Sequence, residues 1–157
     1  MLWLAEPDYE RRTIMHVLRN GFIDGVIVSS MPVDEVIVDA LSRSTLPFIL
    51  VGRDPTHPAV SYVDVENRRG AIEATTHLIR RGRRRIAAIT GPLNTIVGID
   101  RRDGYLEALQ QRGIETIPEL IEAGDFSEED AYNITRRMLA NEPDAIFAAS
   151  DAMATGA

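Results

Sequence analysis

The sequence predicts an α/β fold in which short buried strands alternate with helices around parallel sheet. An apolar run typical of a strand that is buried on both faces occurs at Ile86–Thr90, and further apolar runs that predict strands occur at Gly25–Ser29, Leu46–Val51 and Ala145–Ala149. Between these runs lie longer segments in which apolar residues recur at helical spacing. A regular alternation of strand and helix favours parallel strands joined by right-handed crossovers. With 157 residues, the chain can form one compact domain or two small lobes.

The composition excludes several classes of protein. With 45% hydrophobic and 26% charged residues, the chain has the balance of a soluble globular protein. It contains no cysteine, so disulfides and thiolate chemistry are excluded. No apolar run approaches the roughly 18 residues of a membrane-spanning helix, and Met1–Ala5 is too short for a signal peptide. We therefore expect a cytoplasmic protein with no membrane partner, and the net charge of −7 argues against a nucleic-acid surface.

Before residue 66, the expected elements alternate between strand and helix. They are a strand at Met1–Ala5, a helix opened by Glu6, Pro7 and Asp8 and ended at Asn20-Gly21, a strand at Gly25–Ser29, a helix over Val33–Leu41, a strand at Leu46–Val51 and an extended segment at Val60–Val65. Proline and acidic residues favour the first turn of a helix, and glycine favours its end.

The same alternation is expected from residue 66 onward. Asn67 is a good N-cap for a helix that ends at Gly82, and Ser127 begins a capping-box-like start for a helix to Ala140. The remaining expected elements are the strand Ile86–Thr90, a helix from about Gly98, a strand within Glu115–Ala123 led by Pro118, the strand Ala145–Ala149 and a helix capped by Asp151.

The stretch Ile86–Tyr105 organises this second half. Gly91 and Pro92 end its buried strand. Arg101 is then expected in the first helical turn, where the helix dipole disfavours a cation. That position is easier to explain if the arginine points into a crevice at the carboxyl end of the strand, where open α/β sheets bind ligands.

Six motifs in the chain, in this order, are similar to those of one known family. They are Asp24-Gly25-Val26-Ile27-Val28, Leu50-Val51-Gly52-Arg53, Asn67-x-x-Gly70-Ala71, Ile89-Thr90-Gly91-Pro92-Leu93 with Arg101-x-x-Gly104-Tyr105, Gly124-Asp125-Phe126, and Ser150-Asp151-x-Met153-Ala154-x-Gly156-Ala157. Together they resemble the effector-binding domain of lactose-repressor-like (LacI/GalR) transcription regulators, over essentially the whole chain. The resemblance implies a periplasmic-binding-protein-like type I fold with two partial lobes, 1–65 and 66–157.

The resemblance also implies a function. The chain is expected to bind a small sugar-like effector between its lobes and so to modulate DNA binding. Family members carry a DNA-reading helix-turn-helix before this region and more chain after it, so we expect a fragment that contacts DNA only through a missing domain. A homodimer is expected for the full-length protein, and no cofactor is implied. The alternative is a periplasmic sugar-binding protein that serves transport.

An enzyme is not expected. The sequence has no Gly-x-Ser-x-Gly elbow, phosphate-binding loop or Gly-x-Gly-x-x-Gly motif. His16, His57 and His77 are scattered and lack metal-ligand spacing, so no metal site is expected either. The basic segment Arg80–Arg85 is better explained as a helix end, where cations are favourable, than as a nucleic-acid surface.

The candidate ligand-binding residues are Arg101, Phe126, Ser150, Thr95, Val97 and Arg53. The spacing to Gly104 selects Arg101 over its neighbour Arg102. The resemblance implies that Phe126 stacks on the effector, although a packing role beside the helix cap is the alternative. Ser150 stands where the family often has asparagine. Thr95 and Val97 are expected in a strand-to-helix loop, and Arg53 either lines the first lobe or pairs with Asp54.

Overall fold

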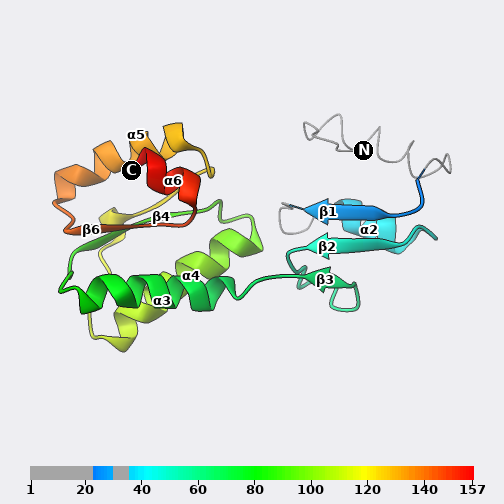
Figure 1. Cartoon of the computed structure of the whole chain (residues 1–157), viewed down its shortest axis with the longest axis horizontal. Helices are drawn as coiled ribbons and strands as arrows, with labels where there is room; N and C mark the ends of the chain where they lie inside the picture. Colours follow the sequence, from blue (N-terminus) through cyan, green and yellow to red (C-terminus); the bar gives the residue numbers. More distant parts are fainter. Residues whose placement is uncertain (1–22, 30–35) are drawn as a thin grey trace. The chain divides into compact units, whose positions relative to one another are not determined.

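The chain forms two compact units. The computed structural model describes residues 23–29 and 36–157 (Figure 1). The units are Met1–Asp64 and Val65–Ala157. The strand expected at Met1–Ala5, the helix expected from Glu6 to Asn20-Gly21 and the expected start of the helix at Val33 lie outside the described residues.

The first unit contains a three-stranded parallel sheet. Its strands β1 (Val26–Ser29), β2 (Phe48–Val51) and β3 (Tyr62–Val63) lie in the order β1-β2-β3, and α2 (Val36–Ser42) follows β1 along the chain. Register partners Val28 and Leu50 belong to one buried cluster with Val38 and Leu41 of α2. A buried strand face therefore meets the apolar side of a helix, as the alternating sequence pattern predicts.

The second unit contains another parallel sheet, in the order β5-β4-β6. All five residues of the central strand β4 (Ile86–Thr90) are buried, between β5 (Ile121–Ala123) and β6 (Ala145–Ala148). Figure 1 shows α3 (Asn67–Arg80) and α4 (Ile96–Gln111) on one face, and α5 (Glu128–Met138) and α6 (Asp151–Gly156) on the other. The predicted α/β class with parallel sheets is confirmed.

Several boundaries differ from the sequence-based expectation. The extended segment at Val60–Val65 is reduced to the two-residue strand β3. Within Glu115–Ala123, Pro118–Leu120 form a 3-10 turn and only Ile121–Ala123 pair with β4. Helix α5 ends at Met138, and Leu139–Asn141 continue as a 3-10 turn. Proline lacks the N–H that a ladder needs, which explains why the strand begins only after Pro118.

Three helix starts also differ from expectation. Asn67 is the first residue of α3 and not its cap; the cap position is Glu66, with no side-chain hydrogen bond. Helix α4 begins at Ile96 because Thr95 Oγ1 accepts a hydrogen bond from Gly98 N at 3.1 Å. Ser150 rather than Asp151 caps α6. The Ser127 cap of α5 is confirmed, since its hydroxyl accepts from Asp130 N at 3.1 Å.

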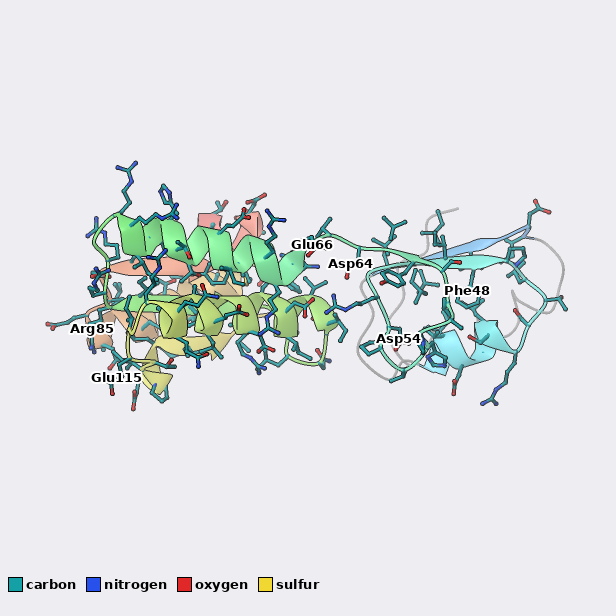
Figure 2. The ribbon with its side chains drawn as sticks, turned by 90° about the horizontal axis from the view of Figure 1, so that it is seen from below. Phe48, Asp54, Asp64, Glu66, Arg85 and Glu115 are labelled. Carbon is teal, nitrogen blue, oxygen red and sulfur yellow. The ribbon has the colours of Figure 1, made fainter. Side chains whose placement is uncertain are left out.

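The basic segment Arg80–Arg85 connects α3 to β4. Asp144 accepts hydrogen bonds from the backbone amides of Arg84 and Arg85 at 2.8 and 3.1 Å. Arg84 Nη1 donates to Ile79 O at 3.1 Å and so satisfies a carbonyl at the end of the helix. Figure 2 shows Arg85 at the end of the second unit away from Glu66. These contacts agree with a structural role for the segment at a helix end.

Helices α3 and α4 approach each other closely at Gly104. A Cβ atom at this position would lie 2.3 Å from Arg68 O and 2.8 Å from the Cβ of Ala71. The next residue, Tyr105, is buried; its hydroxyl donates to Ile86 O at 2.8 Å and its ring stacks on Phe147 at 5.9 Å. Burial raises the pKa of Tyr105 to about 12. The Gly-Tyr pair of the sequence motif thus fixes α4 against both α3 and the sheet.

No helix among the described residues is long and apolar enough to cross a membrane.

Substituting Gly104 with alanine should destabilise the second unit. The new methyl group would overlap backbone, which cannot move aside cheaply, so we expect a loss of about 2 kcal/mol or more in the free energy of unfolding. Gly70→Ala is the matched control, because Gly70 lies in α3 with nothing within 4 Å of its Cβ position. This control should be neutral or stabilise by up to about 1 kcal/mol. Urea denaturation followed by circular dichroism measures both, and equal effects of the two substitutions would contradict the packing argument.

Candidate functional site

The candidate site lies at the carboxyl edge of the β5-β4-β6 sheet. Because all three strands are parallel, the loops that follow them emerge at the same edge. Backbone hydrogen bonds continue the ladder into these loops: Gly124 N donates to Thr90 O at 2.7 Å, and Ala149 N donates to Ile89 O at 2.9 Å. The beginnings of the loops at 124 and 149 are therefore fixed relative to the end of β4.

Arg101 is held at this edge by two neutral oxygen atoms. Its Nε donates to Asn67 Oδ1 at 2.9 Å, and its Nη1 donates to the backbone carbonyl of Ala149. The side chain is half-buried. These bonds use two of the five N–H groups of the guanidinium. Arg101 thus contacts α3 and the end of β6 while retaining donors for a further acceptor.

The position of Arg101 in its helix differs from expectation. Since α4 begins at Ile96, Arg101 lies in the second turn and not in the first. The unfavourable effect of the helix dipole is largely confined to the first turn, so the dipole argument for its orientation is wrong. Its contacts with Asn67 and Ala149 supply the reason instead. The neighbouring Arg102 pairs with Asp103, with Nη2 and Oδ1 2.7 Å apart.

Arg101 also lines a hollow of about 240 Å³ in the second unit. The other lining residues come from the first turns of α3 and from the end of β6 and the residue after it: Asn67, Gly70, Ala71, Phe147, Ala148 and Ala149. Of the six predicted ligand-binding residues, only Arg101 contributes to this hollow. The structure thus groups the arginine with α3, a helix that contains none of the six predicted ligand-binding residues.

Phe126 packs on the exit of β4. Its backbone has a positive φ of 71°, and a Cβ atom placed on Gly91 would lie 2.2 Å from Phe126 Cζ. The ring is half-buried and contacts the apolar core of the second unit. A non-glycine residue in the left-handed region is uncommon and concentrates at functional sites. The geometry supports the packing role that the sequence left open, and the absence of a side chain at Gly91 makes that packing possible.

Thr95, Val97 and Ser150 lie beside the same edge. Thr95 Oγ1 donates to Pro92 O at 2.8 Å in addition to capping α4. Val97 is in the first turn of α4 and half-buried, so its expected place in a loop is wrong. Ser150 Oγ accepts a hydrogen bond from Met153 N at 3.2 Å. Both hydroxyl groups therefore have a structural role as helix caps.

Arg53 belongs to the first unit and follows β2. Its Nη1 donates to Asp64 Oδ2 at 3.1 Å. The alternative pairing with Asp54 is not what the structure shows, because Asp54 receives hydrogen bonds from Thr56 and His57. The carboxylate of Asp64 lies at the end of this unit, one residue before the boundary with the second. Arg53 thus ties the end of β2 to the last residue of its own unit.

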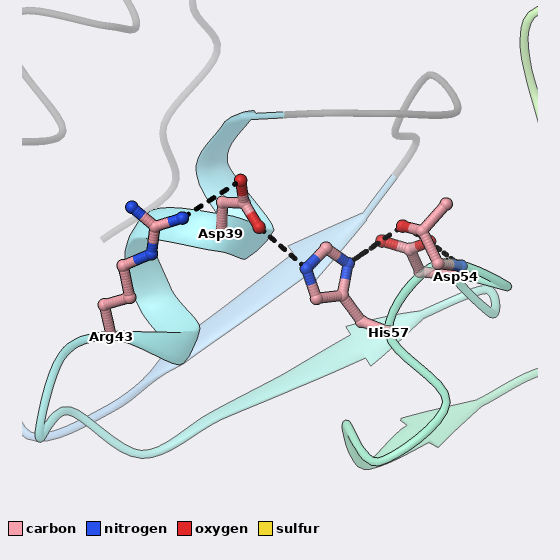
Figure 3. Close-up of polar contacts among 5 residues, drawn as sticks. Asp39, Arg43, Asp54 and His57 are labelled. Carbon is pink, nitrogen blue, oxygen red and sulfur yellow. Dashed lines mark hydrogen bonds and ion pairs between the residues drawn. The ribbon is translucent and has the colours of Figure 1, made fainter.

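Asp39, Asp54 and His57 form an ionisable cluster in the first unit (Figure 3). His57 Nδ1 lies 2.9 Å from Asp54 Oδ2, and His57 Nε2 lies 2.9 Å from Asp39 Oδ1. Asp39 also lies 3.7 Å from Arg43 Nη2. The histidine therefore bridges α2 and the loop after β2. Since its two ring nitrogens face different carboxylates, the three side chains do not converge on one point, and the described residues contain no group suited to a metal ion.

The cluster changes the ionisation of its members. Hydrogen bonds to Asp54 and to Asp39 raise the pKa of His57 above its ordinary 6.5. Burial opposes ionisation of Asp54, but hydrogen bonds from Thr56 and His57 outweigh it and hold the pKa of Asp54 below 3.8. A histidine with a carboxylate on each side is doubly protonated when both nitrogens donate. In its doubly protonated form, His57 therefore joins α2 to the loop after β2 through charged hydrogen bonds.

Family comparison gives the class of protein. A family model described as periplasmic binding proteins and sugar binding domain of LacI family matches residues 2–157. The chain is 39% identical over 144 residues to the HTH-type transcriptional regulator CelR of Thermobifida fusca, covering 89% of this chain and 42% of CelR. It is 29% identical over 156 residues to the regulator AglR of Rhizobium meliloti (strain 1021), covering 98% and 44%. The chain belongs to the family of periplasmic binding proteins and LacI-type sugar-binding domains.

Solved structures agree with this assignment. A transcriptional regulator CelR–cellobiose complex superposes with a TM-score of 0.87 at 36% identity, covering 94% of this chain and 46% of that one. A LacI-type putative transcriptional regulator from Bacillus cereus subsp. cytotoxis NVH 391-98 superposes with a TM-score of 0.92 at 26% identity, covering 99% and 56%. The family resemblance predicted from the motifs is confirmed. The chain spans less than half of the length of CelR and AglR.

Replacing His57 with glutamine should destabilise the first unit in a pH-dependent manner. A raised pKa in the folded state contributes stability that is fully present below pH 6.5 and is lost as the pH rises through the folded-state pKa. The difference in unfolding free energy between wild type and His57→Gln should therefore be larger at pH 6 than at pH 9. Chemical denaturation at both pH values measures it.

Asp39→Asn is the companion variant, because it removes one carboxylate and leaves Asp54 in place. It should show the same pH trend with a smaller amplitude. A difference for His57→Gln that stays constant between the two pH values would contradict the charged bridge.

Proposed function

We propose that this chain is the effector-binding region of a LacI-family transcriptional regulator and that Arg101 binds the effector. The observation that carries this proposal is the fixed guanidinium at the carboxyl edge of the β5-β4-β6 sheet. Two neutral protein oxygens orient it and leave N–H donors for a ligand. Carboxyl edges of parallel sheets are where this class of fold binds small molecules.

The proposed effector is a sugar or a related polyhydroxylated molecule. The CelR structure similar to this chain is a complex with cellobiose. The several N–H donors of a guanidinium suit adjacent hydroxyl groups, and the half-buried ring of Phe126 offers an apolar surface of the kind that such sites contain. Ser150, Thr95, Val97 and Arg53 are proposed as further contacts, with the hydroxyls of Ser150 and Thr95 also serving as caps.

The two units, Met1–Asp64 and Val65–Ala157, are proposed to correspond within one residue to the expected N-terminal lobe, 1–65, and C-terminal lobe, 66–157, of one effector domain, each of them partial. In the whole protein, an effector that binds one arrangement of the lobes better than another shifts the population toward that arrangement. We propose that DNA is contacted through another domain, that the whole protein forms a homodimer and that it is cytoplasmic. The relatives reported above are transcriptional regulators, and they give no support to the transport alternative.

Arg101→Ala in the intact protein should weaken the binding of cellobiose at least about tenfold, since each hydrogen bond from a charged donor contributes roughly 1.5–3 kcal/mol. Isothermal titration calorimetry measures the dissociation constant. Arg102→Ala is the matched control, because Arg102 is the adjacent arginine and pairs with Asp103. It should change the constant less than about twofold.

An unchanged dissociation constant for Arg101→Ala, with circular dichroism showing an intact fold, would remove Arg101 from the binding site. A large loss for Arg102→Ala alone would transfer the proposed role to Arg102.

A further inference from the structure

We infer that Asn67 is a positioning residue, one that orients Arg101 for effector binding and connects it to the chain entering the second unit. This inference rests on the proposed function of Arg101. The sequence favoured a capping role for Asn67, and the structure shows a different one. Asn67 lies inside α3, and no side-chain hydrogen bond caps that helix.

The amide of Asn67 is buried, with the residue only 6% exposed. Burying an amide is costly unless its polar atoms are hydrogen-bonded. Asn67 Oδ1 accepts from Arg101 Nε at 2.9 Å, across the interface between α3 and α4. The buried amide of Asn67 therefore accepts a hydrogen bond from the proposed ligand-binding side chain and does not cap the helix.

The other end of the same amide contacts the backbone at the start of the second unit. Asn67 Nδ2 donates to Val65 O at 3.2 Å, and the backbone N–H of Asn67 donates to the same oxygen at 2.7 Å. Val65 is the first residue of the second unit. One side chain thus connects the guanidinium of Arg101 to the carbonyl of the residue through which the chain enters this unit.

The chemistry of the acceptors suits a binding arginine. Both acceptors, the Asn67 amide oxygen and the Ala149 carbonyl, are neutral. They restrict the rotation of a long side chain, so less conformational entropy is lost when a ligand binds. They do so without a carboxylate that would neutralise the guanidinium. Asn67 therefore orients the guanidinium of Arg101 and leaves its positive charge available to a ligand.

Two substitutions at this position separate the roles of the amide. Asn67→Ala removes both the acceptor for Arg101 and the donor to Val65. Asn67→Asp keeps an acceptor for Arg101 Nε, removes the donor to Val65 and adds a carboxylate, so it should retain the orientation of the arginine while partly neutralising its charge. Thr75→Ala is the control for replacing another buried polar residue of α3, because Thr75 lies two turns further along the helix and its hydroxyl makes no hydrogen bond, to Arg101 or to any other described group.

The experiment uses the intact protein, with cellobiose as the titrant in calorimetry. Asn67→Ala should raise the dissociation constant about fivefold or more, whereas Thr75→Ala should stay within about twofold of wild type. Asn67→Asp should also raise the dissociation constant, because its carboxylate partly neutralises the guanidinium, so the second readout and not the affinity separates Asn67→Asp from Asn67→Ala. The second readout needs no ligand. The Nε–H resonance of Arg101 in ¹⁵N NMR spectra, assigned by its absence in Arg101→Ala, should be protected from exchange in wild type and Asn67→Asp and should lose protection in Asn67→Ala.

An Nε–H resonance that is unchanged in Asn67→Ala, or a dissociation constant for Asn67→Ala no higher than that of Thr75→Ala, would overturn the inference. Failure of the proposed function is distinguishable from this. If Arg101→Ala binds cellobiose as wild type does, or wild type does not bind cellobiose, the proposed role of Arg101 or its effector class is wrong. The NMR comparison then decides by itself whether Asn67 orients the arginine.

Discussion

The close approach of α3 and α4 is the constraint on which the candidate site depends. Gly104 meets Ala71 and the backbone of Arg68 at distances that leave no room for a side chain. Arg101 and Asn67 lie one turn before Gly104 and Ala71 on the same two helices, and their hydrogen bond spans the same interface. Because interiors are close-packed and transmit small displacements, a wider spacing at Gly104 would separate the guanidinium from its acceptor.

The polar groups at the carboxyl edge of the sheet have two separate structural roles. The hydroxyls of Thr95, Ser127 and Ser150 cap the helices that leave the carboxyl edge of the sheet. They set the positions of the helix starts and thereby the loops that surround Arg101. Neutral acceptors hold the arginine, and Phe126 packs over Gly91 at the end of β4. The carboxyl edge of the sheet thus holds Arg101 in one orientation while several of its N–H groups stay available to a ligand. Such preorganisation lowers the free-energy cost of binding.

Local patterns predicted the elements well and long-range contacts poorly. The apolar run Ile86–Thr90 correctly predicted the buried strand β4, and Ser127 correctly predicted the start of α5. Both features depend on residues that are adjacent in the sequence. Ser150 and not Asp151 caps α6 because the hydrogen bonds between β6 and β4 continue to Ala149, which places Ser150 directly before the helix. This contact between strands cannot be read from the adjacent residues. The contact of Asn67 with Arg101, 34 residues away, and that of His57 with Asp39, 18 residues away, arise from tertiary packing. From sequence alone, Asn67 is therefore interpreted as a capping residue, and His57 only as one of three scattered histidines without metal-ligand spacing.

A crystal structure of the intact protein with bound cellobiose tests the central claim most directly. We expect sugar hydroxyls within about 3 Å of the Nη atoms of Arg101, with Arg101 Nε still donating to Asn67 Oδ1. The sugar would lie at the carboxyl edge of the β5-β4-β6 sheet. A bound sugar that makes no contact with Arg101, or an Arg101 that leaves Asn67 when the sugar binds, would contradict it.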